Sequence, residues 1–249
     1  LSTSSPTLTD VIISGNTADN VNSWNSSGGG MFLLASSNPT LTGVTFHSNT
    51  AVVSGGGLQA RYSNIQITRS DFLFNSVNND AGDSYGGGLG YFNSNNTDTN
   101  SFQISIRNSN FNNNNVSSTP INKYAVGGGV SIGEYYDNST ISLQIVGCSF
   151  EHNSAESYGG MHISGEHIDF VIDSTQLMYN EALYYSSAGG FDNGCAGSVS
   201  SSIISNNKLT EDNSPTSETK KSNFSPLHFQ MQSVMILVFG RLFLSSSCH

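Results

Sequence analysis

The chain has 249 residues, and its 18 acidic against 8 basic residues give a formal net charge of −10. This acidic balance excludes electrostatic capture of nucleic-acid phosphates and of anionic lipid headgroups, so we expect no nucleic-acid partner. Only 10% of residues are charged, but 36% are hydrophobic and regularly spaced, which excludes a disordered chain and indicates one large folded domain.

An internal repeat is visible from the N-terminal end onward. The sequence Pro-Thr-Leu-Thr-x-Val occupies residues 6–11 and returns at residues 39–44, each time followed two residues later by a bulky apolar residue, which we call the anchor. The anchors lie 26 to 39 residues apart and are Ile13, Phe46, Phe72, Phe111, Phe150, Leu177 and Ile204. A repeat of this period is typical of a solenoid.

Three further positions keep their residue type relative to the anchor. Five residues before it stands an aliphatic residue: Leu8, Leu41, Ile67, Ile106, Ile145, Ile172 and Val199. Three residues after it stands asparagine, in what we call the Asn column: Asn16, Asn49, Asn75, Asn114, Asn153, Asn180 and Asn207. Five residues after it stands a small or aliphatic residue: Ala18, Ala51, Val77, Val116, Ala155, Ala182 and Leu209. This agreement indicates one structural unit, repeated about seven times.

Runs of glycine lie between the anchors, at residues 28–30, 55–57, 86–88, 127–129, 159–160 and 189–190. Each run is followed by an apolar residue, any residue, and usually a second apolar residue; the last copy, with Phe191 and Asn193, is imperfect. Alternation with period two after a glycine turn predicts a short, half-buried strand.

Each repeat therefore offers two short strands, one led by glycine and one bearing the anchor. Neither strand can bury its apolar side within its own repeat, whereas stacking equivalent strands builds parallel sheets around a continuous interior. We predict an all-β fold over residues 1–210, a right-handed parallel β-helix of about seven coils. The phenylalanine anchors should lie over one another, and the Asn column should bond from coil to coil at a bend. Because Leu1 lies inside a repeat, we expect a fragment of a longer array.

The repeat resembles a known family. The pairing of Gly-Gly-Gly-apolar with Phe-x-x-Asn, seen at residues 46–49, 72–75, 111–114 and 150–153, is similar to the repeat of the chlamydial polymorphic outer-membrane proteins, and it covers about residues 1 to 210. The resemblance implies a right-handed, pectin-lyase-like β-helix and a role at a cell surface, often adhesion. The chain departs from the bacterial family at its C-terminal end, Cys248-His249, which leaves the mode of anchoring open.

The pattern stops after Asn207, and we interpret residues 211–249 as a polar linker followed by an apolar tail. The longest unbroken apolar run, residues 234–239, is far shorter than the roughly 20 residues that a membrane span needs, and Arg241 interrupts its extension. The tail is therefore an anchor, a capping segment or a misread segment, and we expect membrane contact only in the first case.

Enzymatic activity would require reactive side chains on the outside of neighbouring coils. We expect the middle, outward residues of the glycine-led strands to be Phe32, Gln59, Gly90, Ser131, His162 and Asp192, a set without paired carboxylates, Lys or Arg. His162 beside Asp192 is the best acid and base pair, with Glu134 and Glu166 farther along their coils. Solvated surface residues are the simpler interpretation, and we predict no catalytic residue.

Other candidate sites also have plain structural explanations. Asp80 and Asp83 offer oxygen ligands for Ca²⁺, but an Asn- and Gly-rich turn explains them as well, and we predict no metal or cofactor. The three cysteines, Cys148, Cys195 and Cys248, match no metal or redox spacing, and Cys148 is expected to be a small packing residue. Arg61, Arg69 and Arg107 are expected to lie at the surface or to pair with acids. Five sequons stand at Asn25, Asn95, Asn115, Asn138 and Asn223.

Two functions from different classes fit these observations. The preferred one is a noncatalytic module, secreted or at the cell surface, that is adhesin-like and presents loops such as residues 92–103 and 115–125. Its partner would be a protein or glycan on the surface of a host or a neighbouring cell. The alternative is a carbohydrate-active enzyme, a polysaccharide lyase or hydrolase of the pectin-lyase-like class, because many β-helices have such activities.

Overall fold

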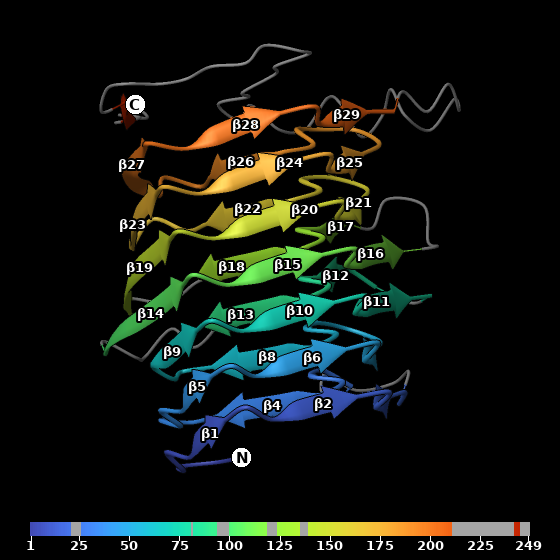
Figure 1. Cartoon of the computed structure of the whole chain (residues 1–249), viewed down its shortest axis with the longest axis vertical. Helices are drawn as coiled ribbons and strands as arrows, with labels where there is room; N and C mark the ends of the chain where they lie inside the picture. The colour runs from blue at the N-terminus through green and yellow to red at the C-terminus, as the bar shows by residue number, and fades with distance from the viewer. Residues whose placement is uncertain are drawn as a thin grey trace.

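The computed structural model describes residues 1–20, 26–80, 82–93, 100–118, 124–134 and 139–210, together with strand Leu242–Leu244. All regular structure in these residues is β-strand, and the strands stack in parallel sets of up to seven. As the chain climbs from the N-terminus, strands run to the right in front and to the left behind, which is a right-handed winding (Figure 1). The predicted right-handed parallel β-helix of about seven coils is thus confirmed. Nowhere in the described residues is there a helix long and apolar enough to cross a membrane.

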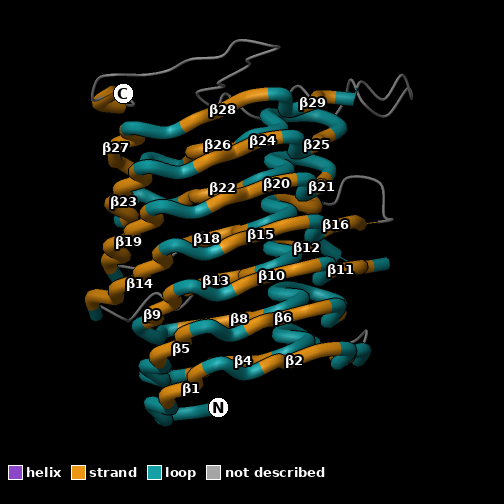
Figure 2. The backbone as a smooth tube through the Cα atoms, in the orientation of Figure 1, coloured by secondary structure: helices purple, strands orange, loops and turns teal. Residues whose placement is uncertain are grey.

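Four sheets enclose the interior, and Figure 2 shows their strands in line from coil to coil. The first sheet contains β1 (Thr7–Thr9), β5 (Thr40–Thr42), β9 (Ile65–Thr68), β14 (Ser101–Arg107), β19 (Thr140–Val146), β23 (Ile168–Asp173), β27 (Ala196–Ser200) and β30 (Leu242–Leu244). The anchor sheet contains β2 (Ile12–Ser14), β6 (Thr45–His47), β10 (Asp71–Leu73), β15 (Asn110–Asn112), β20 (Ser149–Glu151), β24 (Gln176–Met178) and β28 (Ile203–Ser205).

The remaining strands close the coil. The short sheet contains β3 (Thr17–Ala18), β7 (Thr50–Ala51), β11 (Ser76–Asn79), β16 (Asn115–Ser118), β21 (Ser154–Ala155), β25 (Glu181–Ala182) and β29 (Lys208–Leu209). The glycine-led sheet contains β4 (Met31–Leu34), β8 (Leu58–Arg61), β13 (Leu89–Asn93), β18 (Val130–Glu134), β22 (Met161–Ser164) and β26 (Gly189–Asp192). A separate pair joins β12 (Ser84–Tyr85) to β17 (Ala125–Val126).

The anchor-bearing stretch was expected to be one strand, but two bends divide it into three. At each bend one residue per coil has a positive φ. The first bend uses Asp10, Gly43, Arg69, Asn108, Gly147, Ser174 and Ser201, and the second uses Gly15, Ser48, Phe74, Asn113, His152, Tyr179 and Asn206. Most of these residues are not glycine, and the positive φ of each non-glycine residue costs about 1 to 2 kcal/mol of backbone strain. The second bend directly precedes the Asn column, where a bend was expected; the first bend was not predicted, because few glycines mark it.

The anchors lie in register in the interior, as predicted. Phe46 pairs with Phe72, Phe72 with Phe111, and Phe111 with Phe150. Their rings stack with centroids 4.7, 4.5 and 4.8 Å apart, and all four side chains are fully buried. This spacing equals the separation of neighbouring strands, so the coil repeat itself sets the ring contact.

The Asn column forms a continuous hydrogen-bond ladder beside this stack. In the fourth coil, Asn114 Nδ2 donates to Asn153 Oδ1 at 3.0 Å and to the carbonyl of Phe72, the anchor of the coil below, at 2.8 Å. Asn114 Oδ1 accepts from the backbone N–H and from Nδ2 of Asn75, both at 3.0 Å. The predicted coil-to-coil bonding is confirmed, and it satisfies polar groups that are buried beside the apolar core.

The glycine runs form corners before the glycine-led strands, and crowding between successive coils explains why glycine is needed there. The first glycine of each three-residue run has a positive φ, and the second and third lie against the next coil. A Cβ on Gly128 would lie 2.4 Å from the Gly159 carbonyl oxygen and 2.5 Å from that of Ser154. Only a residue without a side chain fits at this separation.

We expect Gly128→Ala to prevent stable folding or to lower the free energy of unfolding by several kcal/mol, because the clash is with backbone atoms that the ladder fixes in place. Gly15→Ala is the control: Gly15 has a φ of 65°, which is unfavourable for alanine, but no atom lies within 4 Å of the added Cβ, so a loss of about 1 kcal/mol is expected. Chemical denaturation of both variants measures the difference. Equal losses would show that crowding against the next coil is not what requires glycine at position 128.

The last glycine pair does not form the sixth corner that the sequence suggested. Gly189 and Gly190 lie within β26, in register with Met161 and His162. Ser187 and Ala188 accept the corner hydrogen bonds from Gly160 and Met161. Consequently Asp192 is opposite Ser164, two residues farther along the strand than predicted.

Strands β1 to β29 fall within residues 7–209, inside the span predicted for the β-helix. In the predicted tail, β30 pairs antiparallel with β27 and so adds a strand to the last edge of the first sheet. Residues 211–241 and 245–249 lie outside the described residues.

Candidate functional site

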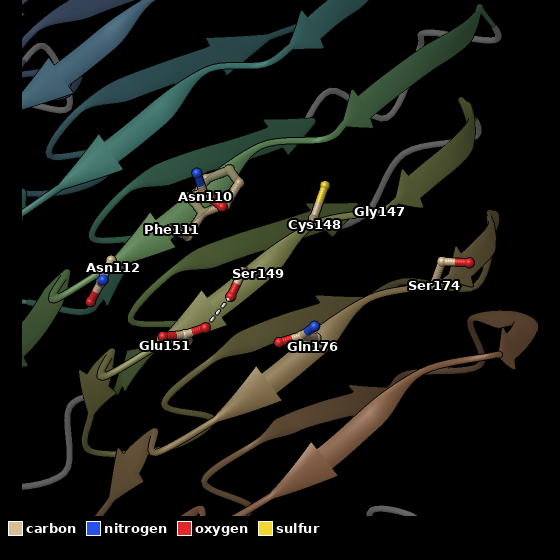
Figure 3. A pocket seen from close by; sticks show the side chains of 9 residues that line it. All are labelled: Asn110, Phe111, Asn112, Gly147, Cys148, Ser149, Glu151, Ser174 and Gln176. Atoms are coloured by element: carbon tan, nitrogen blue, oxygen red, sulfur yellow. Dashed lines mark hydrogen bonds between the residues drawn. The ribbon is translucent and has the colours of Figure 1, made fainter. Parts of the chain in front are cut away.

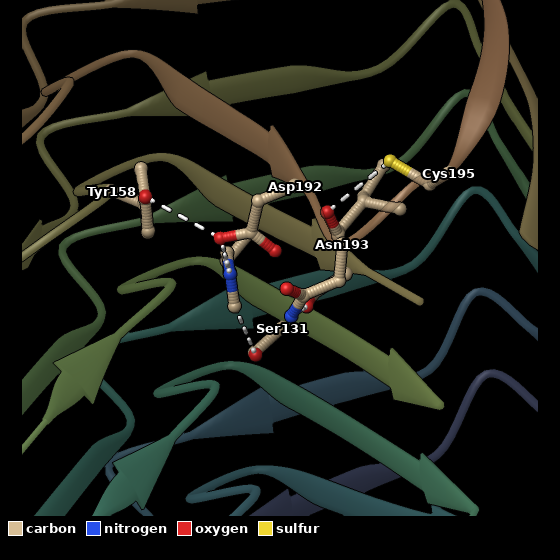
Figure 4. Close-up of polar contacts among 8 residues, drawn as sticks. Ser131, Tyr158, Asp192, Asn193 and Cys195 are labelled. Atoms are coloured by element: carbon tan, nitrogen blue, oxygen red, sulfur yellow. Dashed lines mark hydrogen bonds and ion pairs between the residues drawn. The ribbon is translucent and has the colours of Figure 1, made fainter. Parts of the chain in front are cut away.

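His162 and Asp192 contact each other across two consecutive coils, on β22 and β26. His162 Nε2 lies 3.1 Å from Asp192 Oδ2, so the sequence-based pairing of these two residues is realised despite the shifted register. On the other side of the ring, His162 Nδ1 lies 3.4 Å from Ser131 Oγ. The tautomer with its proton on Nε2 donates to Asp192 and leaves Nδ1 to accept from the Ser131 hydroxyl. Dashed lines at the labelled Asp192 and Ser131 side chains mark these two contacts in Figure 4.

This cluster is covered, although it lies on the outward side of its sheet. The Tyr158 ring stacks on the His162 ring with centroids 4.7 Å apart and planes 2° from parallel. Tyr158 also donates to Asp192 Oδ2 at 3.4 Å (Figure 4). The ring fits because Gly190 has no side chain there: a Cβ would lie 2.1 Å from Tyr158 Cε1. Side-chain exposure is only 6% for His162 and 8% for Asp192.

Ser131, His162 and Asp192 have the composition of a hydrolytic triad, but a substrate cannot reach them. Ser131 is fully buried, so a substrate carbonyl cannot approach its Oγ while the neighbouring coils are in place. A catalytic hydroxyl must be within reach of the reacting atom. In this conformation the three side chains form a buried polar network through Asp192 Oδ2, whereas Asp192 Oδ1 is buried without a hydrogen bond to any described residue.

The Asp192 carboxyl has a pKa below its ordinary value. Burial acts to raise this pKa, but the charge of His162 and its hydrogen bond outweigh that effect and lower it. A carboxyl whose pKa is depressed by folding stabilises the folded state above its unfolded pKa, and that contribution disappears as the pH falls through the folded value.

Replacing Asp192 by Asn should therefore lower the free energy of unfolding at pH 7 by about 1 to 3 kcal/mol, because a buried imidazole loses a charged partner. The advantage of the wild type should shrink below about pH 4. Asp169→Asn, at an exposed position on β23, should change stability by less than about 0.5 kcal/mol. Urea titrations at pH 7 and pH 3 test both statements, and a difference between wild type and Asp192→Asn that grows in acid would contradict them.

The two glutamates considered with this pair lie elsewhere. Glu134, at the end of β18, is buried and faces His167, with 3.4 Å between Glu134 Oε2 and His167 Nδ1. Glu166 is exposed. The structure thus pairs Glu134 with a different histidine, not with His162.

Hydrogen bonds from backbone N–H groups to side-chain oxygens hold the loop that contains Asp80 and Asp83. Asn79 Oδ1 accepts from the Gly82 N–H at 3.0 Å, and one Asp83 carboxylate oxygen accepts from the Tyr124 N–H at 2.9 Å. Asp80 is exposed. In the described part of the chain, no three His, Cys, Asp or Glu side chains are grouped so as to hold a metal ion.

Cys148 and Cys195 are buried free thiols. Burial raises the pKa of Cys148 to about 11 and that of Cys195 to about 12, so both are protonated at neutral pH and are poor nucleophiles. Cys148 occupies the position at which other coils have valine, serine or threonine, and its side chain is buried in the hydrophobic core, as expected of a packing residue. Cys248 lies outside the described residues.

The remaining predicted features are mostly at the rod surface. Arg107 donates to the Gln144 amide oxygen at 2.5 Å and pairs with no acid among the described residues. Asn115 is half-buried in β16 and accepts from Ser154 Oγ at 2.8 Å. The sequons at Asn25, Asn95, Asn138 and Asn223, and the central parts of the loops 92–103 and 115–125, lie outside the described residues.

A depression on the outward face of the anchor sheet was not predicted from the sequence. It lies across β15, β20 and β24, and has a volume of about 310 Å³ (Figure 3). Its lining consists of Asn110, Phe111, Asn112, Gly147, Cys148, Ser149, Glu151, Ser174 and Gln176. We call it the anchor-sheet groove. No pattern within one repeat could have revealed it, because it arises from differences between neighbouring coils.

Comparison with family models, curated proteins and solved structures finds no match for this chain.

Proposed function

We propose that this chain is a noncatalytic, adhesin-like module, secreted or at a cell surface, that binds a protein or glycan on a host or neighbouring cell. One observation carries the proposal. The best acid and base pair is enclosed by Tyr158 and the adjacent coils, whereas the outward face of the anchor sheet carries accessible polar side chains in a groove. An arrangement of this kind favours binding over turnover.

The scaffold suits such a role. The ladder and the ring stack fix the separation of successive coils, so outward side chains are held at a repeat of about 4.8 Å along the rod. Preorganised side chains lose little conformational entropy when a ligand binds. The alternation of Gly-Gly-Gly-apolar with Phe-x-x-Asn resembles the polymorphic outer-membrane protein repeat, which supports a surface location and adhesion.

A carbohydrate-active enzyme remains the second candidate, because Ser131, His162 and Asp192 form a continuous polar line. Such an enzyme would need Tyr158 to move away from the imidazole. The acidic pair required for hydrolysis of a glycosidic bond is not found in this cluster, which has a single carboxylate.

A depolymerisation screen separates the two functions. The chain would be incubated with neutral and acidic polysaccharides, and reducing ends and unsaturated products would be measured; retention on the same immobilised polymers and on fixed cells would report binding. We expect retention on a cell or polymer without product. Product formation that is lost in both His162→Ala and Asp192→Asn would overturn the proposal in favour of the enzyme.

A further inference from the structure

The anchor-sheet groove has features that identify a class of ligand. We propose that the groove, with the neighbouring rings of His152 and Tyr179, binds an uncharged sugar residue of a glycan. This inference rests on the proposed function, since it names the ligand and the face of the rod that an adhesin-like module would use. It concerns a site on the anchor sheet, not the enclosed cluster on the glycine-led sheet.

The groove exists because one coil has a small residue between two coils with larger ones. In the fifth coil, Ser149 lies between Asn110 below and Gln176 above, in register along the sheet. Figure 3 shows the Asn110, Ser149 and Gln176 side chains on three consecutive strands, with Glu151 at the end of the middle one. The depression is therefore built into the rigid sheet and needs no rearrangement to form.

Several polar atoms in the groove are available to a ligand. The side-chain amide of Gln176, which is exposed, makes no hydrogen bond with any described residue. Asn112 accepts from Asn113 through Oδ1, which leaves its Nδ2 as a donor. Glu151 accepts from Ser149 Oγ at 2.6 Å through Oε1, which leaves Oε2 as an acceptor (Figure 3). Amide donors beside a carboxylate acceptor match the adjacent hydroxyls of a sugar, each of which both donates and accepts.

Charge restricts the ligand further. The groove lining contains one carboxylate, Glu151, and no lysine or arginine, and the chain as a whole carries a net charge of −10. A uronic acid, a sialic acid or a sulfated sugar would be repelled by Glu151 and would find no lysine or arginine among the residues that line the groove. We therefore restrict the ligand class to neutral sugars.

Aromatic rings border the groove where β20 and β24 end. His152 and Tyr179 directly follow Glu151 and Met178, and their rings stack with centroids 5.1 Å apart and planes 7° from parallel. Tyr179 is 45% exposed, although it is a bulky side chain on a left-handed backbone with a φ of 56°. The C–H face of a sugar ring packs well on such a ring, as apolar surface does generally, while its hydroxyls reach the polar groove.

The groove is less well suited to a protein partner than to a neutral sugar. The groove lining has no outward apolar side chain to enter a partner's pocket, since Phe111 and Cys148 are buried in the interior. Protein interfaces derive most of their affinity from such buried anchors. Binding through a protein epitope is accordingly an outcome that the test must distinguish.

The test uses the full chain, displayed in many copies on beads so that weak single-site binding is detected. The beads are applied to an array of neutral and acidic glycans, and the preferred neutral glycan is then titrated by NMR or calorimetry. Gln176→Ala and Tyr179→Asn should each weaken binding at least fivefold, because each removes one contact with the sugar. Asparagine is chosen for Tyr179 because Asn113 and Asn206 occupy the same bend in other coils.

Two matched controls accompany these variants. Gln66→Ala removes an exposed glutamine from the first sheet, and Phe74→Asn makes the aromatic-to-Asn change at the same bend in the third coil. Neither should alter the affinity by more than about twofold. Binding only to acidic glycans, no glycan binding, or equal effects of site and control variants would each overturn the site. If cells are still bound without glycan dependence, the proposed function survives and only this site fails.

Discussion

Replacing Asn114 by Ala is expected to lower the free energy of unfolding by about 3 to 6 kcal/mol. The side chain lies in the middle of the ladder, where its amide donates twice and its carbonyl oxygen accepts twice. Its removal leaves the backbone N–H and Nδ2 of Asn75 without their acceptor in a fully buried region, and each such group costs about 1 to 3 kcal/mol. Denaturation in guanidinium chloride, followed by far-UV circular dichroism, measures the loss.

Two comparisons identify the ladder as the cause. Asn16 is exposed at the N-terminal end of the same column, so Asn16→Ala should cost less than about 1 kcal/mol. Asn114→Asp keeps the acceptor for Asn75 but loses the donor to Asn153, and it should be destabilised as well. Similar losses for Asn16→Ala and Asn114→Ala would mean that the ladder does not stabilise the stack.

Phe111→Ala should lower the free energy of unfolding by about 3 to 5 kcal/mol. The Phe111 ring is fully buried, with stacked neighbours 4.5 Å below and 4.8 Å above, and the strands on either side cannot collapse into the cavity because their ladder bonds fix the spacing. Phe111→Leu should cost less, because Leu177 already occupies the same position two coils away. Thermal and guanidinium unfolding of both variants would show the order.

Phe74→Ala is the control for the ring stack. This variant also replaces a phenylalanine by alanine, but at a position that is 55% exposed. The free energy of unfolding should therefore change by less than about 0.5 kcal/mol. A loss close to that of Phe111→Ala would indicate that the outer rings, and not the interior stack, support the coil.

Much of the fold was predictable because stacked coils have the same packing and hydrogen-bonding requirements at equivalent positions. Each interior position meets its own equivalent above and below, so the anchors and the Asn column had to keep their residue types. The positive φ at the bends was not predictable, since Arg69, Phe74 or Tyr179 in this conformation is tolerated only because the surrounding ladder determines the backbone. The register of the last coil was also missed, because Ser187 and Ala188 meet the corner's hydrogen-bond requirement without glycine.

The candidate site was predictable only in part, because it depends on residues that do not follow the repeated pattern. Coil order brings His162 and Asp192 together, but their enclosure depends on Tyr158, which lies outside the repeated pattern. The anchor-sheet groove depends on Ser149 being shorter than Asn110 and Gln176. Such differences between coils become meaningful only when the register is known.

The central claim, that this chain binds through its outward face while its enclosed pair is structural, is tested most directly by saturable binding of the labelled chain to cells. The measurement compares wild type, the double variant Gln176→Ala with Tyr179→Asn, and Asp192→Asn, each at a temperature where it is folded. We predict saturable binding that falls at least tenfold in the double variant and is retained by Asp192→Asn. Loss of binding in Asp192→Asn, with full binding by the double variant, would contradict the account.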